Sequence, residues 1–359
     1  CPAFKKVIET PFTVDAFCYG KIEGCSAYFL THFHSDHYTG LGPSFEHGPI
    51  YCSSVTGNLV ISELRVKPEY VHRLKLNREY DIQGIKVTLI DANHCPGAAL
   101  ILFDIPTTDA LDKPDRIKIL HTGDFRASPE HIKHPSLRDV RLHAVYLDTT
   151  YCAPSHCFPE QSLVVRAISS LARPGRLLVA VGTYLIGKER IFVGIAKAMG
   201  SKIYVEPRKH RILSCLEDPE LARMLTQDKD EADLHVVSMG QMNRESLRTM
   251  LQANPSYTHL VAVRPTGWTF RGKPQPQGAD VPFGIQHLQP QRIAHNITLF
   301  GIPYSEHSSF LELEAFITQL NGADGGRGAI HRVIPTVNNH NQTAMRQMDA
   351  WFSKWLGRS

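Results

Sequence analysis

The residues best suited to chemistry in this chain are four ionisable side chains within six consecutive positions. His32, His34, Asp36 and His37 follow an apolar, strand-like run at 25–30, so they lie where a buried strand gives way to a loop. Imidazole nitrogen and carboxylate oxygen are both good ligands for zinc. The alternative is a polar loop whose histidines only hydrogen-bond to one another, and further candidate ligands elsewhere in the chain disfavour it.

Two more side chains extend this cluster. His94 and Asp124 each follow another strand-like segment. A first cation could take His94 with the first two histidines of the cluster, leaving one position for solvent. A second could take Asp36, His37 and one further residue, and Asp124 could bridge both because a carboxylate has two acceptor oxygens. Two cations about 3.5–4 Å apart activate water and stabilise both oxygens of a displacement. This pattern predicts hydrolytic chemistry without a serine or cysteine nucleophile.

The elements that must position these residues are short strands that end in polar loops. Segments 85–90, 116–120 and 143–147 have strand-like patterns. They lead into the polar segments 91–97, 121–126 and 148–151. Ligand sites in layered α/β folds form where strand ends and loops converge, so we expect one shared site. Segment 104–115, rich in Asp, Thr and Pro, predicts an exposed hairpin loop or insertion.

Beyond residue 151, helical and strand-like segments alternate. Helical spacing covers 160–171, 190–199 and 309–320, and strand-like segments cover 176–181, 234–239, 258–263, 297–302 and 332–337. Residues 271–292 carry Pro, Gly and Gln, which indicates a loop or linker. We therefore expect residues 1–150 to form the first part of one domain and 151–296 to form a second domain. Residues 297–359 would then return to complete the first.

Composition and charge set broad limits on the class of protein. The 359 residues favour two domains over one, and 42% of them are hydrophobic. The net charge of +4 permits a polyanionic partner without requiring one. No apolar run approaches the roughly 20 residues that span a bilayer, so we expect no membrane segment. The eight cysteines form no C-x-x-C pair, which favours reduced thiols in an intracellular protein. Cys1 in place of Met predicts a domain cut from a longer chain.

The motif at 32–37, followed by His94 and Asp124, resembles the metal-ligand pattern of the metallo-β-lactamase superfamily. Asp15 is similar to that superfamily's early aspartate, which supports the metal-binding loop without binding metal. The resemblance implies an α/β fold, an αββα sandwich, with one or two Zn²⁺ ions and with Mg²⁺ as an alternative activating ion. The implied metal ligands are His32, His34, Asp36, His37, His94, Asp124 and His307.

The second half of the chain narrows this resemblance. Segment 147–151, which contains Asp148, is similar to the acidic motif that opens the β-CASP insert of the nucleic-acid-processing branch. Segment 303–309 resembles that branch's returning histidine motif, so His307 would complete the second metal site. The resemblance covers nearly the whole chain and is closest to the DNA cross-link repair exonuclease subfamily, which includes Artemis and Apollo. The implied catalytic residues are Asp36, Asp148 and His307.

One position separates DNA enzymes from RNA enzymes within this branch. RNA-processing members carry a histidine in the final motif, whereas segment 334–338 presents Val337. His340 lies three residues further on, after the predicted strand, and does not take that position. The resemblance therefore implies DNA as the substrate.

Two serines are candidate contacts for the substrate. Ser309 and Glu312 have the spacing of a helix capping box. Free backbone N–H groups at such a helix end, beside His307, would suit a terminal 5′-phosphate, with Ser308 and Ser309 as its contacts. The alternative is a simple helix cap with no ligand.

A second set of substrate contacts is expected in the middle of the chain. Segment 182–189 nearly matches a P-loop, but Glu189 stands where Ser or Thr would hold magnesium, which argues against an ATPase. Lys188 in this Gly-containing loop is a candidate for a backbone phosphate, or else an exposed surface lysine. The basic run 207–211 could follow a DNA backbone. Further candidates, for contact or base stacking, are Thr183, Tyr184 and Trp268.

The sequence thus predicts a zinc-dependent 5′-to-3′ DNA exonuclease acting on 5′-phosphorylated single strands or duplex ends. The resemblance implies a nuclear protein of interstrand cross-link repair, and we expect a monomer. An RNA nuclease on the same scaffold is the nearest alternative. A small-molecule hydrolase is disfavoured because it needs no insert at 151–296, and a catalytically inactive scaffold is disfavoured by the intact ligand set.

Overall fold

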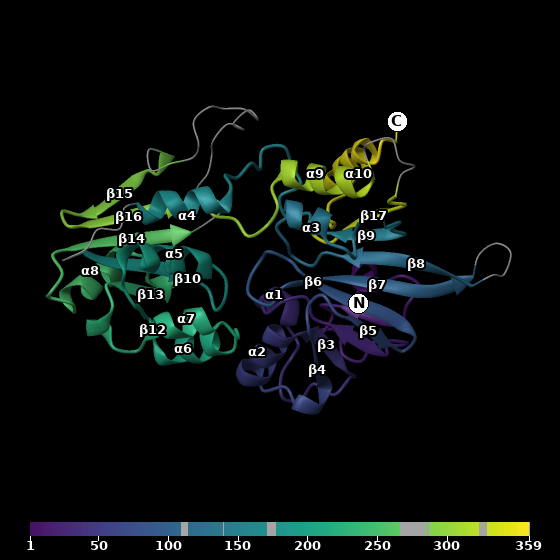
Figure 1. Ribbon diagram of the computed structural model, residues 1–359, viewed down its shortest axis with the longest axis horizontal. Coiled ribbons are helices and arrows are strands. Elements are labelled where there is room, and N and C mark those ends of the chain that lie inside the picture. The colour runs from purple at the N-terminus through teal and green to yellow at the C-terminus, as the bar shows by residue number, and fades with distance from the viewer. Residues whose placement is uncertain are drawn as a thin grey trace. The chain divides into compact units, whose positions relative to one another are not determined.

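The computed structural model describes residues 1–108, 114–138, 140–170, 177–265, 284, 287–322 and 329–358. The chain forms two compact units (Figure 1). Unit 1 contains residues Cys1–His156 and Glu306–Ser359, and unit 2 contains Cys157–Ser305. Unit 1 is therefore built from two separate stretches of the chain.

Unit 1 consists of two β-sheets and the helices that cover them. Its strands are β1 (Phe12–Val14), β2 (Ala27–Phe29), β3 (Ile50–Ser53), β4 (Val71–Leu74), β5 (Glu79–Ile82), β6 (Ile85–Asp91), β7 (Ala99–Thr108), β8 (Pro114–His121), β9 (Ala144–Leu147) and β17 (Val333–Pro335). Its helices are η1 (Ala3–Lys5), α1 (Ser35–Tyr38), α2 (Ser54–Leu64), η2 (Pro68–Tyr70), α3 (Pro129–Lys133), α9 (Phe310–Leu320) and α10 (Gln342–Trp355).

The two sheets of unit 1 pack face to face. One is parallel, with the order β1-β2-β3-β4, and the other is mixed, with the order β17-β9-β8-β7-β6-β5. Phe12 and Phe29 from the first sheet meet Phe103 from the second, with ring centroids of Phe29 and Phe103 5.1 Å apart. Figure 1 shows the layers in the order α9 and α10, mixed sheet, parallel sheet, α2. This arrangement confirms the predicted αββα sandwich.

Unit 2 contains one seven-stranded sheet between helices. Its strands are β10 (Leu177–Thr183), β11 (Ile203–Tyr204), β12 (Leu225–Thr226), β13 (Leu234–Ser238), β14 (His259–Pro265), β15 (Pro290–Ala294) and β16 (Ile297–Ile302). Its helices are α4 (Gln161–Ser169), α5 (Glu189–Met199), α6 (Pro207–Ser214), α7 (Pro219–Met224), η3 (Lys229–Glu231), η4 (Met239–Gln241) and α8 (Arg244–Gln252).

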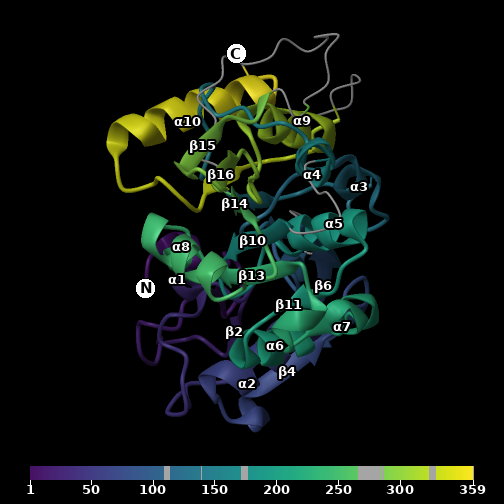
Figure 2. The same ribbon diagram turned by 90° about the vertical axis from the view of Figure 1, so that its left-hand side faces the viewer.

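The sheet of unit 2 has the order β12-β11-β13-β10-β14-β16-β15 and is parallel except for β15. The chain moves from β10 to β11 in one direction across the sheet and from β13 to β14 in the other. Because such crossovers are right-handed, the connecting helices must lie on opposite faces. Figure 2 shows α5 and α8 on opposite sides of the sheet.

Most predicted elements of the first unit are confirmed, with one exception. The predicted strands at 85–90, 116–120 and 143–147 correspond to β6, β8 and β9. The hairpin expected at 104–115 is present, but its strands are longer than expected, because β7 runs to Thr108 and pairs residue by residue with β8 from Pro114. Cross-strand pairing here outweighs the turn-forming residues, and residues 109–113 lie outside those described.

The end of the second unit also differs from the prediction. Residues 297–302 are predicted to belong to the returning part of the first domain, but β16 pairs with β14 and β15 in the sheet of unit 2. Unit 2 therefore extends to Ser305. The predicted linker 271–292 falls largely outside the described residues, and its end forms the first part of β15. A buried strand such as Ile297–Ile302 fits either sheet by its sequence pattern alone.

Within the described ranges, none of the helices is both long enough and apolar enough to cross a bilayer.

A glycine turn fixes the loop that carries His94. The hydroxyls of Ser53 and Thr56, at the start of α2, donate hydrogen bonds of 2.6 and 3.0 Å to the carbonyl oxygen of Gly97. Gly97 has a φ of +80°, and a Cβ atom placed there would lie 2.8 Å from Cβ of Val55. The loop after β6 therefore needs glycine for its backbone conformation and for its close approach to α2.

Gly97 and Gly84 offer a matched comparison. Gly84 has a φ of +82°, but a Cβ atom placed there would have no neighbour within 4 Å, so Gly84→Ala carries only the backbone cost, about 1–2 kcal/mol. We expect Gly97→Ala to cost about 1–3 kcal/mol more because Val55 must move. Thermal unfolding of both variants in EDTA measures this difference. Equal midpoints would contradict the steric role of Gly97.

Candidate metal centre

Five histidines and one aspartate converge at one edge of unit 1. His32 and His34 follow β2, and His37 lies in the short helix α1. His94 follows β6, Asp124 follows β8, and His307 precedes α9. β6, β8 and β9 run in the same direction, so their carboxyl ends share one edge of the mixed sheet. The side chains expected to share one site thus lie close together at these strand ends.

The carboxylate of Asp124 lies at the middle of this cluster. Its Oδ2 atom is 3.2 Å from Nε2 of His37 and 3.7 Å from Nε2 of His32. The same oxygen lies 4.0 Å from Nε2 of both His94 and His307. One oxygen within 4.0 Å of four imidazole nitrogens fits the position predicted for a bridging carboxylate.

His34 joins the cluster through its other ring nitrogen. Its Nδ1 atom lies 3.0 Å from Nε2 of His32 and 3.1 Å from Nε2 of His94. Three groups of side chains have ligand atoms within 4.8 Å of one another. The groups are His32, His34 and His94; His32, His37 and Asp124; and His94, Asp124 and His307.

Hydrogen bonds outside the cluster fix which ring nitrogen faces inward. His94 donates its Nδ1–H to the backbone carbonyl of Glu306 at 2.8 Å, because a carbonyl can only accept. His307 donates its Nδ1–H to the carboxylate of Asp148 at 2.9 Å. In both rings the lone pair therefore remains on Nε2, which faces the cluster.

Asp15 fixes His37 directly and His32 through Thr31. Its Oδ2 accepts hydrogen bonds of 2.7 Å from the Thr31 hydroxyl and from Nδ1 of His37. The Thr31 hydroxyl proton is thereby used, so the 2.9 Å contact to Nδ1 of His32 has the imidazole as donor. Nε2 of His32 consequently carries a lone pair toward Asp124, whereas Nε2 of His37 lies 3.2 Å from the Asp124 carboxylate, as a donor to it would. Asp15 has a φ of +52°, a conformation that non-glycine residues rarely adopt.

The pKa values of His94, Asp124 and His37 indicate the protonation states of the cluster without a cation. Burial lowers the pKa of His94 to about 3, so this ring is neutral at pH 7. Burial alone would raise the pKa of Asp124, but the neighbouring His37 holds it well below its usual value. Burial alone would lower the pKa of His37, but Asp124 and Asp15 raise it well above its usual value. A cation that binds here must therefore displace a proton from His37.

The donor set fits divalent metal ions. His32, His94 and His307 have Nδ1 engaged as a donor and direct an Nε2 lone pair at the same small volume, and His37 offers its Nε2 there once a cation displaces its proton. Neutral imidazoles with a carboxylate are the ligands that zinc prefers in catalytic sites. The cluster is therefore chemically complete as a site for divalent metal.

Comparison with known proteins assigns the family. Residues 219–341 match the family model described as DNA repair metallo-beta-lactamase. The chain is 44% identical to the DNA cross-link repair protein SNM1 of Arabidopsis thaliana, over 100% of this chain and 70% of that protein. This chain belongs to the SNM1/Pso2 family of DNA cross-link repair proteins.

Two other relatives support the family assignment. The chain is 43% identical to the DNA cross-link repair protein pso2/snm1 of Schizosaccharomyces pombe, over 97% of this chain and 63% of that protein. It is 31% identical to the 5′ exonuclease Apollo of Gallus gallus, over 87% of this chain and 60% of that protein. The chain thus spans less than two thirds of the length of these two relatives.

Asp36 and Asp148, the two aspartates predicted as catalytic in this SNM1/Pso2-family chain, differ in burial. Asp36 is exposed and its Oδ2 lies 3.4 Å from Nε2 of His37, at the open edge of the cluster. Asp148 is buried, and it contacts the cluster by accepting the hydrogen bond from His307. Its other oxygen accepts hydrogen bonds from the backbone and hydroxyl of Thr150. Asp148 therefore positions His307.

The helix end at Ser308 and Ser309 differs from the expectation. The predicted capping box is confirmed, with Ser309 Oγ accepting from the N–H of Glu312. Ser308 Oγ accepts from the N–H of Ala127 and donates to the carbonyl of Phe125. The expected free N–H groups are not present at 308, 309, 310 and 312, because each donates within the protein. This geometry favours the alternative of a simple cap, and the phosphate contact stays a prediction.

The remaining substrate candidates lie in unit 2. Lys188 is buried at the start of α5, with Nζ 5.3 Å from the ring centroid of Tyr304, so it is not an exposed surface lysine. Thr183 and Tyr184 line a cavity at the end of β10. The basic run 207–211 lies in α6. Trp268 lies outside the described residues.

Sequence reasoning missed two parts of the centre. Thr31 links Asp15 to His32, and its position directly before His32 was a usable signal. The carbonyl of Glu306 holds His94 across 212 positions of sequence, and no residue type can reveal a backbone contact of this kind.

Removing the charge of Asp15 tests the support of the metal centre in this family member. We expect Asp15→Asn to weaken metal binding about 10–100-fold, because Nδ1–H of His37 loses its carboxylate acceptor. Competition against a chromophoric zinc chelator measures the affinity. Asp91→Asn is the control, since its carboxylate bonds to the N–H of Asn93 outside the cluster. Equal zinc affinity in both variants would contradict the role of Asp15.

Proposed function

We propose that this chain is a metal-dependent 5′-to-3′ DNA exonuclease that hydrolyses phosphodiester bonds from 5′-phosphorylated ends. The observation that carries the proposal is the cluster of imidazoles around Asp124, with ring nitrogens fixed for metal binding. Membership of the SNM1/Pso2 family supports DNA as the substrate. The similarity to a relative named 5′ exonuclease Apollo supports the direction of attack.

The metal ligands would form two adjacent sites. His32, His34 and His94 would hold one ion. His37 and His307, with Asp36 at the open edge, would hold a second, and Asp124 would bridge the two. Nitrogen and oxygen donors favour zinc. Bound divalent cations would lower the pKa of water and neutralise negative charge on the scissile phosphate.

The protein itself contributes position and electrostatics. Asp148 holds the ring of His307 through its Nδ1–H, and Asp15 does the same for His37. Asp36, the exposed carboxylate of the cluster, is free to contact solvent or an incoming strand end. Its pKa lies below the usual value because of the hydrogen bond with His37, so it is ionised at neutral pH and can accept a proton only in acid.

We further propose that unit 1 is the metallo-β-lactamase domain and unit 2 the β-CASP domain. The αββα layers and the metal ligands of unit 1 support the first assignment. The insertion of unit 2 between Asp148 and His307, two residues joined by a hydrogen bond, supports the second.

Val337 supports DNA over RNA. Its backbone N–H and carbonyl both bond to the hydroxyl of Thr149, the residue after Asp148. The position at which RNA-processing members carry histidine therefore adjoins the metal centre, and this chain has no titratable group there. His340 is exposed, beyond this contact. Family membership further supports interstrand cross-link repair in the nucleus, with DNA as the partner.

Digestion of a 3′-labelled single strand tests the proposal directly. We expect the wild type to produce a ladder from a 5′-phosphorylated strand and little product from a 5′-hydroxyl strand. Asp36→Ala should lower the rate at least about tenfold, because a charged group at the open edge of the centre is lost. Its side chain is 76% exposed, so the variant should fold.

Ser35→Ala is the matched control, because Ser35 is exposed and adjacent but has no ligand atom in the cluster. It should digest the strand at the wild-type rate. Faster digestion of an RNA strand of the same sequence would reverse the substrate assignment. No cleavage of either strand with zinc or magnesium would overturn the proposal.

A further inference from the structure

Unit 2 contains a cavity remote in sequence from every metal-ligand candidate. It has a volume of about 550 Å³ and lies at the carboxyl ends of the parallel strands β10 and β13. In α/β sheets, ligands bind outside the carboxyl ends of strands where the chain changes direction across the sheet. β10 is that position here. From β10 the chain continues to β11 on one side of it, and after β13 it crosses to β14 on the other side.

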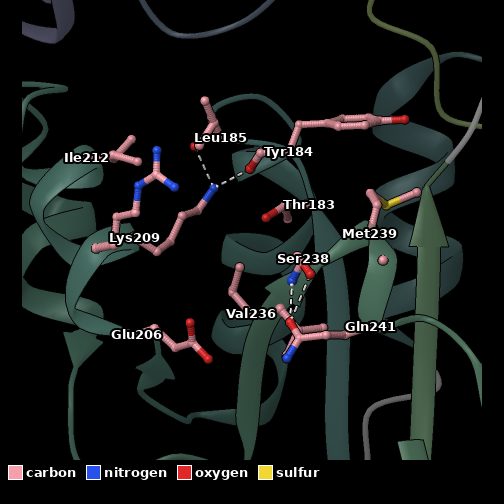
Figure 3. A pocket seen from close by; sticks show the side chains of 13 residues that line it. Thr183, Tyr184, Leu185, Glu206, Lys209, Ile212, Val236, Ser238, Met239 and Gln241 are labelled. Carbon is pink, nitrogen blue, oxygen red and sulfur yellow. Dashed lines mark hydrogen bonds between the residues drawn. The ribbon is translucent and has the colours of Figure 1, made fainter. Parts of the chain in front are cut away.

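The cavity presents an aromatic face together with apolar side chains. Tyr184 is 59% exposed, more than any other large hydrophobic residue in the described ranges. Ile212 and Val236 are buried residues that also line the cavity, and Met239 adds a polarisable side chain. Figure 3 shows these side chains around the central Thr183. A planar, partly apolar ligand would find contact surface here without rearrangement of the sheet.

Three polar groups in the cavity have unused hydrogen-bonding capacity. The Thr183 hydroxyl and the Glu206 carboxylate make no side-chain hydrogen bond within the part of the chain that the structure describes, although Thr183 is only 4% exposed. Gln241 accepts hydrogen bonds from the N–H and hydroxyl of Ser238, which leaves its amide N–H₂ as a donor. These groups can therefore bond to solvent or to a ligand that enters the cavity.

Basic side chains border the same cavity. Lys209 donates hydrogen bonds of 2.8 Å to the carbonyls of Tyr184 and Leu185, which fixes the loop that carries the aromatic ring (Figure 3). Arg208, the preceding residue in the first turn of α6, is exposed and lines the cavity. A guanidinium group is suited to a phosphate because its N–H donors match two phosphate oxygens.

We propose that this cavity binds a nucleoside monophosphate, with the base against Tyr184 and the phosphate at Arg208. Thr183, Glu206 and Gln241 offer the acceptors and donor that a base edge and a sugar hydroxyl require. The inference rests on the proposed nuclease function, because a nuclease encounters such a nucleotide in two forms. One is the 5′-mononucleotide that an exonuclease releases, and the other is an unpaired nucleotide within a bound strand.

Amide NMR spectra of the full chain in EDTA test the proposal. Titration with 5′-dAMP at millimolar concentration should shift the amides of 183–185, 206–209 and 236–241. Tyr184→Ala should weaken binding at least about fivefold, whereas Tyr184→Phe, which keeps the ring, should stay within about twofold. Arg208→Ala should reduce the affinity for dAMP to that for deoxyadenosine. Arg211→Ala is the control, because Arg211 lies in the same helix but does not line the cavity.

A short 5′-phosphorylated oligonucleotide distinguishes the two sources. Binding of dAMP identifies the released product as a ligand. Binding of the oligonucleotide alone, still dependent on Tyr184, identifies a nucleotide within a strand. Absence of both, or shifts that Tyr184→Ala leaves unchanged, overturns the proposal. Strand digestion by the same preparation distinguishes the two proposals. Normal cleavage without nucleotide binding refutes only the proposed role of the cavity. Nucleotide binding without cleavage refutes only the proposed nuclease function.

Discussion

The structure of unit 1 depends on holding several imidazole lone pairs around one buried carboxylate. Asp124 stays ionised despite burial because His37 and other rings of the cluster surround it. Such a cluster is unfavourable in a folded chain without cations, since its ring nitrogens are crowded together and removed from water. Rigid hydrogen bonds must therefore fix each ring before a metal arrives.

Those hydrogen bonds come from parts of the chain that the αββα sandwich brings together. Asp15 and Thr31 lie at the end of the parallel sheet, and Asp148 lies at the end of the mixed sheet. The carbonyl of Glu306 arrives only after the whole of unit 2 has been traversed. The metal centre can thus form only when both sheets and the returning segment are in place, which couples ligand geometry to the folding of unit 1.

Both units place polar side chains at the ends of strands, in different surroundings. In unit 1, strands such as β6 and β8 end in ligand-bearing loops, and charge is concentrated around Asp124. In unit 2, β10 and β13 end at a cavity that is lined by separate polar side chains and by the exposed ring of Tyr184. Strand ends in both cases place backbone and side-chain polar groups at a surface that a rigid sheet supports.

The sequence by itself determined the ligand types, their order along the chain and the strand ends that carry them, because residue chemistry and period-2 patterns are local properties. The motif at 32–37 and the capping box at Ser309 follow from such signals, whereas the place of His307 came from the resemblance of segment 303–309 to a family motif. Tertiary structure alone decided that β16 joins the second sheet, that Glu306 orients His94, and that the N–H groups of Ser308 and Phe310 bond to distant carbonyls. Those outcomes depend on which distant backbone atoms meet, and no local pattern encodes that.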